Sequence, residues 1–366
     1  MGSRRTAIVR IERFSGAIGA ASNARRSWGR REGFLVTIED DGGMVGTGEA
    51  SPLPGYSPDD IARSARALRG ACASPPSPLR PDRPVEPQLV TALRDIDPGA
   101  PAARFAIESA LLDLAARRAG VSVSRLLAGD RAERTIPLSA LLRERDPDRV
   151  ATEARGAAAR GVAALKMKVG VPGRFDEEAE AFRRAREAAG GAILLRADAN
   201  GAWSPAEARR KMAVLAETAP EYVEQPVGAE ELLRFAGAPV PVAADETLLL
   251  PGAAGRLLRG SARERVRVLV LKPTLLGGFT AALRIARSAE RAGTRVTVGH
   301  ALEGPVALAA AAELALALPG EPLPCGLDPH PGLEAWPAGP PPQIGPAVIR
   351  PSGRTGLGVD PRRDRR

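Results

Sequence analysis

From about Thr135 onward the sequence alternates short apolar runs with longer amphipathic stretches rich in Ala, Arg and Glu. This alternation predicts repeated strand–helix units, which pack around a parallel sheet. Eight candidate strands with helical connections favour a TIM-type β/α barrel. An open doubly wound sheet is the alternative, but no GxGxxG motif follows a strand to support it. The candidate strands are Ile136–Leu141, Ala164–Val169, Ile193–Ala197, Tyr222–Glu224, Val242–Ala244, Val266–Leu271, Arg295–Val298 and Leu323–Gly326.

Helical segments are expected between these strands, and several carry start and stop signals. Ser204 and Asp146 each precede a proline, which is typical of a helix N-cap followed by the first helical residue. Gly190 and Gly293 follow amphipathic stretches and are typical of helix ends. The clearest predicted helices are Glu177–Ala189, Pro205–Ala219 and Thr280–Ala292.

The first 130 or so residues follow a different pattern. Strand character appears in Ala7–Ile18 and Gly33–Ile38, and Asp41-Gly42-Gly43 fits a hairpin turn. Helical stretches follow at Pro58–Arg69 and Pro101–Ala119. This mixture predicts an α+β domain placed before the barrel.

Proline-rich stretches interrupt this domain and follow the barrel. Ser74–Pro87 is expected to form a loop, and the aperiodic tail over Trp336–Pro351 is expected to pack back on the N-terminal domain. We therefore predict a capping domain over residues 1–130, completed by the tail from about 330 to 366. The barrel, over residues 131–329, carries the active site.

Composition and charge pattern exclude several classes of function. The net charge of +9 comes from basic residues scattered along the chain, with basic runs at its two ends, Arg4-Arg5 and Pro361–Arg366. No basic patch is interleaved with aromatics, as single-stranded nucleic-acid binding would require. No apolar run has membrane-spanning length or the place of a signal peptide, and Cys72 and Cys325 lack the spacing of metal ligands. We expect a cytoplasmic protein with neither nucleic acid nor a membrane as partner; the sequence makes no prediction about oligomeric state.

Lysine is rare in this chain and unevenly placed. Arginine is almost permanently protonated, whereas lysine can be tuned to take and give a proton. Three of the lysines stand at the ends of predicted strands and are therefore candidates for proton transfer. Among 52 Lys and Arg residues the only lysines are Lys166, Lys168, Lys211 and Lys272.

Five successive predicted strands finish with an ionisable residue at the C-terminal end, which faces the active site in a β/α barrel. In chain order these residues are Lys168, Asp198, Glu224, Asp245 and Lys272. Three carboxylates converging from neighbouring strands repel one another unless a cation lies among them. Oxygen ligands without His or Cys favour Mg²⁺ over zinc, with Mn²⁺ able to take its place.

The two strands that end in lysine lie on opposite sides of the predicted barrel mouth. Lys168 and Lys272 therefore face each other across the cation site. Lys166 is two residues before Lys168, so both side chains leave the same face of the strand. A single Asp such as Asp198 at a strand end is more often a helix N-cap, but caps explain neither the lysines nor five consecutive strands. The sequence therefore predicts a metal-dependent active site.

The motifs at these strand ends resemble those of the enolase superfamily, in its muconate-lactonizing subgroup, along nearly the whole chain. The resemblance implies a modified (β/α)₇β TIM-type barrel, an N-terminal α+β capping domain and an essential Mg²⁺. It also implies that the enzyme removes the proton next to a substrate carboxylate and stabilises the enediolate on the metal, a strategy the superfamily uses widely. The motifs are K-x-K at Lys166–Lys168, D-A-N at Asp198–Asn200, E-Q-P at Glu224–Pro226, A-D-E at Ala244–Glu246 and L-K-P at Leu271–Pro273.

Several stretches are most similar to the o-succinylbenzoate synthases of this subgroup: Gly48–Ser57, Arg104–Leu114, Leu302–Leu308 and Cys325–Asp328. The resemblance implies a lyase of menaquinone biosynthesis that dehydrates 2-succinyl-6-hydroxy-2,4-cyclohexadiene-1-carboxylate to o-succinylbenzoate. In that reaction Lys168 is the base, then the acid for the departing hydroxyl, and Lys272 stabilises the enediolate. An N-acylamino acid racemase or dipeptide epimerase remains the alternative, because the same lysine pair serves both chemistries. Dipeptide epimerases usually carry Asp-x-Asp where this chain has Gly326-Leu327-Asp328, which counts against them.

Two further expectations concern the surroundings of the site. Gly46–Tyr56 and Ser15–Trp28 are rich in Gly and Ser and are expected to form mobile loops that cover the substrate. His300 replaces the small hydroxyl residues common after the seventh strand of the family. We interpret His300 as a polar residue near the substrate rather than the base, and His330 as structural.

Overall fold

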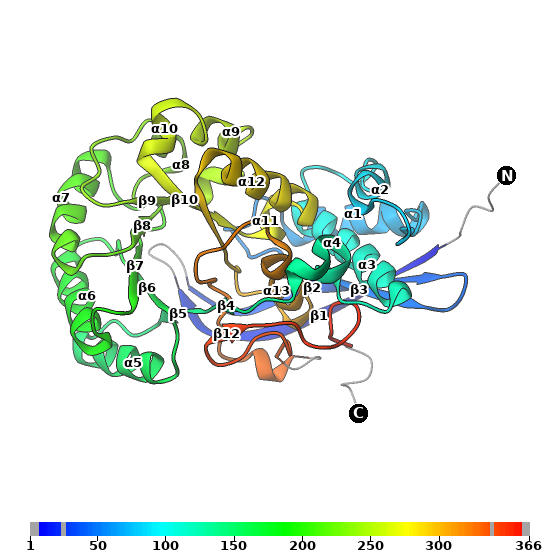
Figure 1. Ribbon diagram of the computed structural model, residues 1–366, viewed down its shortest axis with the longest axis horizontal. Coiled ribbons are helices and arrows are strands. Elements are labelled where there is room, and N and C mark those ends of the chain that lie inside the picture. The colour runs from blue at the N-terminus through cyan, green and yellow to red at the C-terminus, as the bar shows by residue number, and fades with distance from the viewer. Residues whose placement is uncertain (1–6, 23–26, 337–339, 361–366) are drawn as a thin grey trace.

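Seven parallel strands form a curled sheet in the order β11-β10-β9-β8-β7-β6-β5 in the computed structural model, which describes residues 7–22, 27–336 and 340–360 (Figure 1). Every neighbouring pair in this order is parallel, and Lys168, Asp198 and Glu224 lie in register across three strands. Seven of the eight predicted barrel strands are therefore confirmed, the first of them only in its second half. Their bounds are β5 Ser139–Leu142, β6 Ala164–Lys168, β7 Leu194–Asp198, β8 Tyr222–Glu224, β9 Val242–Ala244, β10 Val266–Leu271 and β11 Arg295–Val298.

The eighth predicted strand, Leu323–Gly326, is present only as isolated bridges. Its Leu323 N–H donates to Val296 on β11 at 2.9 Å, and its Cys325 carbonyl accepts the Ser139 N–H of β5 at 2.8 Å. The segment therefore closes the barrel between the first and last strands. The segment does not form a longer ladder, because Pro324 has no N–H group to donate.

The predicted first strand, Ile136–Leu141, is split in two. Its beginning, β4 (Ile136–Pro137), pairs antiparallel with β12 (Val348–Ile349) from the tail, and only β5 joins the barrel. The tail is thus attached at the base of the barrel.

Helices alternate with the barrel strands, and the predicted start and stop signals are confirmed, although α6 and α12 begin one or two residues earlier than predicted and α7 ends at Leu215. Ser204 accepts the Glu207 N–H in a capping box, and Asp146 accepts the Arg149 N–H. Gly190 and Gly293 are the C-caps of α6 and α12. No helix in the described part of the chain has both the length and the apolar character needed to cross a membrane. The helices are α5 Pro147–Ala159, α6 Phe175–Ala189, α7 Pro205–Leu215, α8 Ala229–Leu232, α9 Ala253–Leu257, α10 Gly260–Arg265, α11 Pro273–Leu276, α12 Phe279–Ala292 and α13 Pro305–Ala317.

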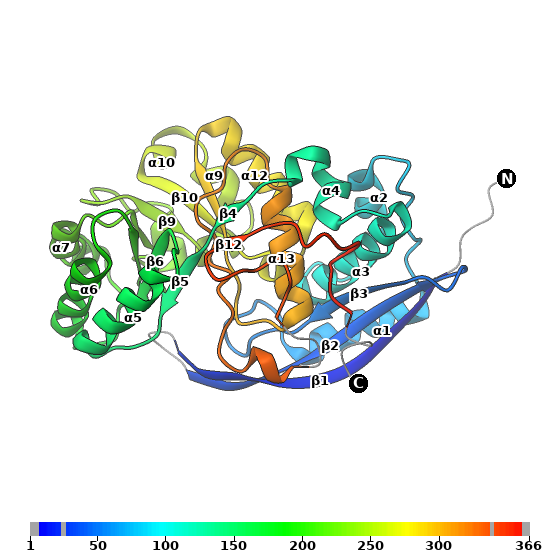
Figure 2. The same cartoon turned by 60° about the horizontal axis from the view of Figure 1, so that its bottom comes forward.

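The N-terminal part is an antiparallel sheet, β1-β2-β3, covered by helices. Figure 2 shows its two long strands as a ribbon that extends from the cap helices towards the barrel strand β5. The fold is therefore a TIM-type barrel with an N-terminal capping domain. The cap elements are β1 Ala7–Ser22, β2 Ser27–Asp40, β3 Val45–Ala50, α1 Ile61–Ala73, α2 Val85–Ala92, α3 Pro101–Ala119 and α4 Val123–Ala128.

Two predictions about loops are wrong in part. In Gly46–Tyr56 the first five residues belong to β3, and only Ser51–Tyr56 is a loop. In Ser15–Trp28 the described residues belong to β1 and β2, while residues 23–26 lie outside the described part of the chain. The glycines of β3 permit close packing instead of mobility: a Cβ on Gly48 would lie 1.9 Å from the Ala106 carbonyl of α3. Ser74–Pro87 is a loop only as far as Pro84, because α2 begins at Val85 and accommodates a proline in its first turn.

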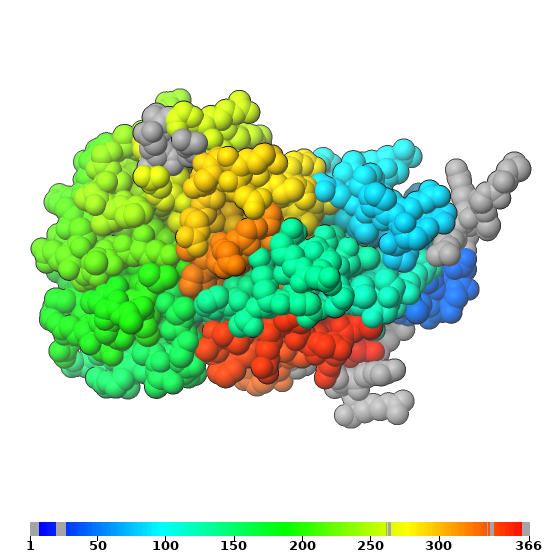
Figure 3. Space-filling view, viewed as in Figure 1, coloured from blue at the N-terminus to red at the C-terminus, as the bar shows by residue number. Residues whose placement is uncertain are grey.

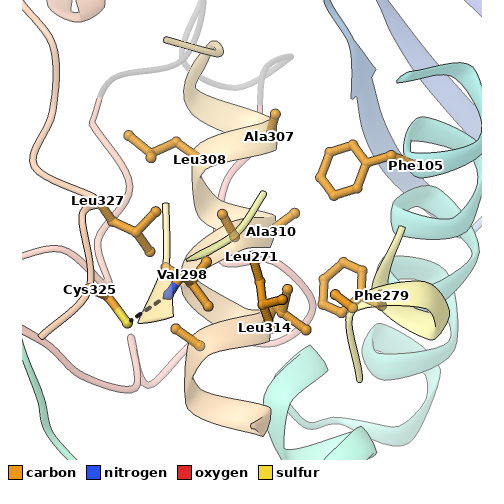
Figure 4. Close-up of a cluster of buried hydrophobic side chains, with 14 of the residues drawn as sticks. Phe105, Leu271, Phe279, Val298, Ala307, Leu308, Ala310, Leu314, Cys325 and Leu327 are labelled. Atoms are coloured by element: carbon orange, nitrogen blue, oxygen red, sulfur yellow. Dashed lines mark hydrogen bonds between the residues drawn. The ribbon is translucent and has the colours of Figure 1, made fainter. Parts of the chain in front are cut away.

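The core is continuous between cap and barrel, with α13 at its centre (Figure 4). Every residue of this helix is buried, including its four consecutive alanines, Ala309–Ala312. Next to it the rings of Phe105 from α3 and Phe279 from α12 stack with centroids 6.3 Å apart. Small side chains thus fill a core that has few aromatic residues.

The C-terminal tail lies along the junction of the two domains, beside the segment that leads into the barrel (Figure 3). The Leu357 N–H donates to Asp113 of α3 at 2.7 Å, and Arg117 donates to the Val359 carbonyl at 3.0 Å. The tail therefore contacts both the cap helix α3 and, through β12, the base of the barrel. The basic runs Arg4-Arg5 and Pro361–Arg366 lie outside the described residues.

Candidate active site

A cavity opens at the C-terminal ends of the barrel strands and has an empty volume of about 1290 Å³, which includes its open mouth. Cap residues form part of its wall, among them Ile18, Trp28 and Tyr56. The predicted residues Lys166, Lys168, Asp198, Glu224 and Lys272 all line it. The site is therefore a joint product of the barrel and the cap.

Lys166 and Lys168 share one side of this cavity with two buried carboxylates. The Lys166 ammonium lies 3.1 Å from both oxygens of Glu224 and 3.4 Å from Asp198 Oδ2. The Lys168 ammonium lies 3.2 Å from the same Asp198 oxygen. Two residues of strand spacing put both lysines on one face, as predicted.

Lys272 reaches the opposite side from β10, with three strands between it and β6. It forms a buried ion pair with Asp245, which follows β9 directly. The Tyr56 hydroxyl, from the cap, lies 2.6 Å from the Lys272 ammonium and 3.0 Å from Asp245 Oδ2. The two lysines thus have separate carboxylate partners.

Burial and neighbouring charge shift the pKa values of these groups. Burial raises the pKa of Glu224 to about 7, assisted by the negative charge of Asp198. Burial also acts on Asp198, but Lys168 and Lys166 outweigh it and lower the pKa of that carboxyl. Burial disfavours the charged form of Lys272, yet Asp245 and Tyr56 outweigh it and hold the pKa of Lys272 well above its ordinary value. Lys272 is accordingly an ammonium ion in this arrangement.

A chain of hydrogen bonds fixes the position of Lys168. Its ammonium donates to Asn200 Oδ1 at 2.8 Å, and Asn200 Nδ2 donates to Glu246 Oε1 at 3.1 Å. The backbone of Asn200 is in the left-handed region, with φ of 46°, and its N–H donates to Asp198 Oδ1. The D-A-N and A-D-E motifs are therefore joined through their polar side chains, a contact that strand spacing alone does not reveal.

The predicted metal ligands Asp198, Glu224 and Asp245 stand at the ends of three adjacent strands. In the described residues, no three His, Cys, Asp or Glu side chains form a group that could hold a metal ion as they stand. Instead, lysine ammonium groups contact all three carboxylates. The donor chemistry still fits a hard cation, because the three carboxylates are buried. The nearby Glu246 also has a buried Oε2 for which the described residues provide no hydrogen-bond partner.

Both histidines line the cavity, but their nitrogens are engaged. His300 Nδ1 accepts the Leu302 N–H at 3.0 Å, and Nε2 lies 3.2 Å from the Asp328 carbonyl, to which it donates as the protonated nitrogen. Burial lowers the pKa of His300 to about 3. His300 is therefore a neutral, fixed imidazole and not a base. His330 is buried, with Nε2 2.9 Å from the Glu303 carbonyl.

Two family models match the chain. Residues 20–128 match the model described as "Mandelate racemase / muconate lactonizing enzyme, N-terminal domain". Residues 149–365 match the model described as "Enolase C-terminal domain-like".

Curated relatives and solved structures that resemble the chain include dipeptide epimerases and an o-succinylbenzoate synthase. A hydrophobic dipeptide epimerase from Roseobacter litoralis is 37% identical over 220 residues, which are 59% of this chain and only 62% of that protein. An o-succinylbenzoate synthase from Desulfotalea psychrophila is 32% identical over 307 residues, 76% of this chain and 82% of that protein. A dipeptide epimerase from Methylococcus capsulatus, crystallised with Mg and the dipeptide L-Arg-D-Lys, matches with a TM-score of 0.84 at 28% identity, covering 97% of this chain and 98% of that one.

Proposed function

The chain belongs to the enolase superfamily, within the mandelate racemase / muconate lactonizing enzyme family, and from this premise we propose that it removes the proton next to the carboxylate of a small-molecule substrate. The observation that carries the proposal is the pair of lysines on opposite sides of one cavity. Lys168 and Lys272 come from β6 and β10, and each is held by a different carboxylate. Two amine groups held on opposite sides of one cavity can transfer protons to and from a carbon atom that is bound between them.

Asp198, Glu224 and Asp245 would hold Mg²⁺, the ion bound in the Methylococcus capsulatus structure. When bound, the ion would supply positive charge that makes the adjacent C–H bond of a carboxylate substrate more acidic. Lys166, which lies between Asp198 and Glu224, keeps a positive charge beside these ligands. Burial alone would lower the pKa of Lys166, but Glu224 and Asp198 outweigh it and raise that pKa.

The two lysines would divide the proton transfers between them. As the neutral amine, Lys168 accepts the α-proton at Nζ, which breaks the substrate C–H bond and leaves the electron pair on the substrate. Lys272, charged in this arrangement, donates a hydrogen bond to the developing negative charge. Asn200 and Glu246 keep the Lys168 amine directed at the cavity.

As the specific reaction we propose the o-succinylbenzoate synthase reaction, the dehydration of 2-succinyl-6-hydroxy-2,4-cyclohexadiene-1-carboxylate. Lys168 would pass the abstracted proton to the departing hydroxyl, so that water leaves and the ring becomes aromatic. One base suffices for this reaction, in keeping with the charged state of Lys272. The Desulfotalea psychrophila relative, matched over 82% of its length, supports this assignment.

Racemisation or epimerisation of N-acylamino acids or dipeptides is the second candidate. Here Lys272 would return a proton to the opposite face of the α-carbon after Lys168 has removed one. The opposed placement of the lysines favours this reaction, and the Roseobacter litoralis and Methylococcus capsulatus relatives support it.

An assay of the purified protein with Mg²⁺ separates these reactions. Loss of the cyclohexadiene absorbance, abolished by EDTA and by Lys168→Ala, is the result expected for the synthase. Incorporation of solvent deuterium at the α-carbon of N-acylamino acids or dipeptides, without loss of the diene, would assign racemase or epimerase activity. Lys211→Ala, a lysine that contacts Phe175 and Trp203 outside the cavity, is the matched control and should remain active. Full activity in Lys168→Ala, or no activity of any kind in folded, Mg-loaded protein, would overturn the proposal.

A further inference from the structure

The side of the cavity formed by the ends of β5 and of the barrel-closing segment carries charged residues that the proposed proton transfer does not use. Arg143 follows β5, and Asp328 follows the closing segment Leu323–Gly326. Both line the same cavity as the lysines. Resting on the proposed function, we propose that Arg143 binds a second anionic group of the substrate, so that the site takes carboxylates with another carboxylate several bonds from the α-carbon.

Asp328 is already balanced by arginine. Its Oδ2 lies 3.9 Å from Arg143 Nη1 and 4.0 Å from Arg160 Nη2, and its side chain is only 18% exposed. Burial raises the pKa of Asp328, and the two arginines partly offset that effect. A substrate ammonium group would therefore have to compete with two guanidinium groups for this carboxylate.

Two further acids lie near Arg143. Glu153 accepts the backbone N–H groups of Arg143 at 2.8 Å and of Glu144 at 3.0 Å. The half-exposed Glu144 carboxylate, which lines the cavity, lies 3.9 Å from Arg149, a contact longer than a direct hydrogen bond. Glu153 is thus committed to the backbone and Glu144 is open to solvent, so neither offers a substrate cation a buried partner.

The Arg143 guanidinium can still donate hydrogen bonds to a ligand. Its Nη2 donates to the Pro329 carbonyl at 3.3 Å, and its contact with Asp328 is longer than a direct hydrogen bond. A guanidinium has five N–H donors in a planar fork that matches a carboxylate, and this side chain is 31% exposed. A substrate carboxylate that enters the cavity would meet this guanidinium at its wall.

Apolar side chains also contribute to the cavity wall. Ile18, Trp28 and Leu53 from the cap, with Leu141 and Leu302 from the barrel, also line the cavity. This arrangement suits a molecule with a carboxylate at each end and an uncharged middle, such as an amino acid acylated by a dicarboxylic acid or a ring acid with an oxo-acid arm. It disfavours a free dipeptide, whose amino group is an ammonium ion.

Calorimetry with the Mg-loaded full chain and an isosteric pair tests the inference without requiring turnover. N-succinyl-L-phenylalanine and N-butyryl-L-phenylalanine differ by a terminal carboxylate in place of a methyl group. We expect the wild-type protein to bind the succinyl compound about 10- to 100-fold more tightly, as a charged hydrogen bond of this kind contributes. Arg143→Gln should bring this ratio close to one and leave the Kd for the butyryl compound unchanged. Arg143→Lys should restore part of the preference for the succinyl compound. The control Arg149→Gln should keep the wild-type ratio.

Three results would overturn the inference. The wild-type protein could bind the two compounds with equal Kd values, or bind L-Ala-L-Phe more tightly than the succinyl compound. Alternatively, Arg143→Gln could weaken the binding of both compounds by the same factor. Failure of the proposed function has a different signature. It would be seen as selective binding of the succinyl compound by a protein that neither dehydrates the cyclohexadiene nor exchanges an α-proton.

Discussion

Asp198 stands at the end of β7 with the ammonium groups of two lysines beside one of its oxygens. We expect Asp198→Asn to weaken Mg²⁺ binding at least 10-fold, because the amide removes one negative charge from the ligand set. Calorimetric titration of the folded variant with Mg²⁺ measures this loss.

The control is Asp146→Asn, which changes an aspartate that caps α5 by accepting the Arg149 N–H. That variant should keep the wild-type Mg²⁺ affinity. Unchanged affinity in Asp198→Asn as well would contradict its assignment as a ligand.

Asn200 and Glu246 provide a second prediction at the residue scale. Asn200→Ala removes the acceptor 2.8 Å from the Lys168 ammonium, so kcat should fall about 10- to 100-fold while KM changes little. Glu246→Gln should retain most of the activity, because an amide oxygen can still accept the Asn200 N–H. Steady-state kinetics on both variants measure the changes in kcat and KM separately. A rise in KM with kcat unchanged would show that Asn200 binds substrate instead of positioning the lysine.

The charged residues of the site could be predicted because strand-end spacing is local. Lys168, Asp198, Glu224 and Lys272 each follow or end an apolar run, and barrel topology brings such ends together. The Tyr56 contacts could not be predicted, since they join residues 189 and 216 positions apart across two domains. The partnership of Arg143 with Asp328 depends on barrel closure in the same way.

At the scale of elements, the contact between α3 and α12 buries a carboxylate. Glu108 accepts the Thr280 N–H at 2.9 Å and the Thr280 hydroxyl, while its Oε2 has no hydrogen-bond partner in the described residues. Burial raises the pKa of Glu108 to about 7 from an ordinary value of 4.5. The folded protein therefore binds a proton more tightly here than the unfolded chain does.

This shift predicts that Glu108 makes the fold less stable as the pH rises from 4.5 to 7. Below 4.5 the carboxyl is protonated in both states, and above 7 the folded state must bury its charge. Glu108→Gln should remove this dependence and be more stable than wild type at pH 8 by up to about 3 kcal/mol. Urea unfolding at pH 5 and pH 8 measures the difference.

Glu230→Gln, at an exposed position of α8, is the matched control and should unfold like wild type at both pH values. Identical pH dependence in wild type and Glu108→Gln would contradict the prediction.

Elements with strong local signals were predicted well, and those defined by tertiary contacts were not. The capping box at Ser204 and the C-cap at Gly293 are encoded within a few residues. The glycines of β3 were taken for loop residues, because only the packing of α3 against the sheet shows why a side chain is excluded. The proline-rich start of α2 likewise gives no helical signal until its first turn is complete.

At the scale of the whole molecule, Glu49 joins the cap to the barrel. This buried β3 carboxylate accepts the N–H groups of Gly304 at 2.7 Å and Ala307 at 3.1 Å, at the start of α13. Arg31 of β2 donates to the carbonyls of Ser51 and Ala301 beside it. The wall that carries Tyr56 is thereby held against the barrel.

We expect Glu49→Ala to lower the free energy of unfolding by about 2–3 kcal/mol, because it leaves two buried N–H groups without an acceptor. Denaturant titration measures the loss. Glu32→Ala, which removes a half-exposed carboxylate of the same sheet, should cost less than about 0.5 kcal/mol. Equal losses in the two variants would show that the junction does not depend on Glu49.

The concentration of lysine in the cavity has a practical consequence for chemical probing. An amine-acylating reagent has only four side-chain targets in this chain, and Lys166, Lys168 and Lys272 all line one cavity. The many surface arginines do not react with such a reagent under the same conditions. Peptide mapping of the acylated protein therefore reports on access to that cavity, and most directly on Lys168, with Lys211 as an internal standard on the same molecule.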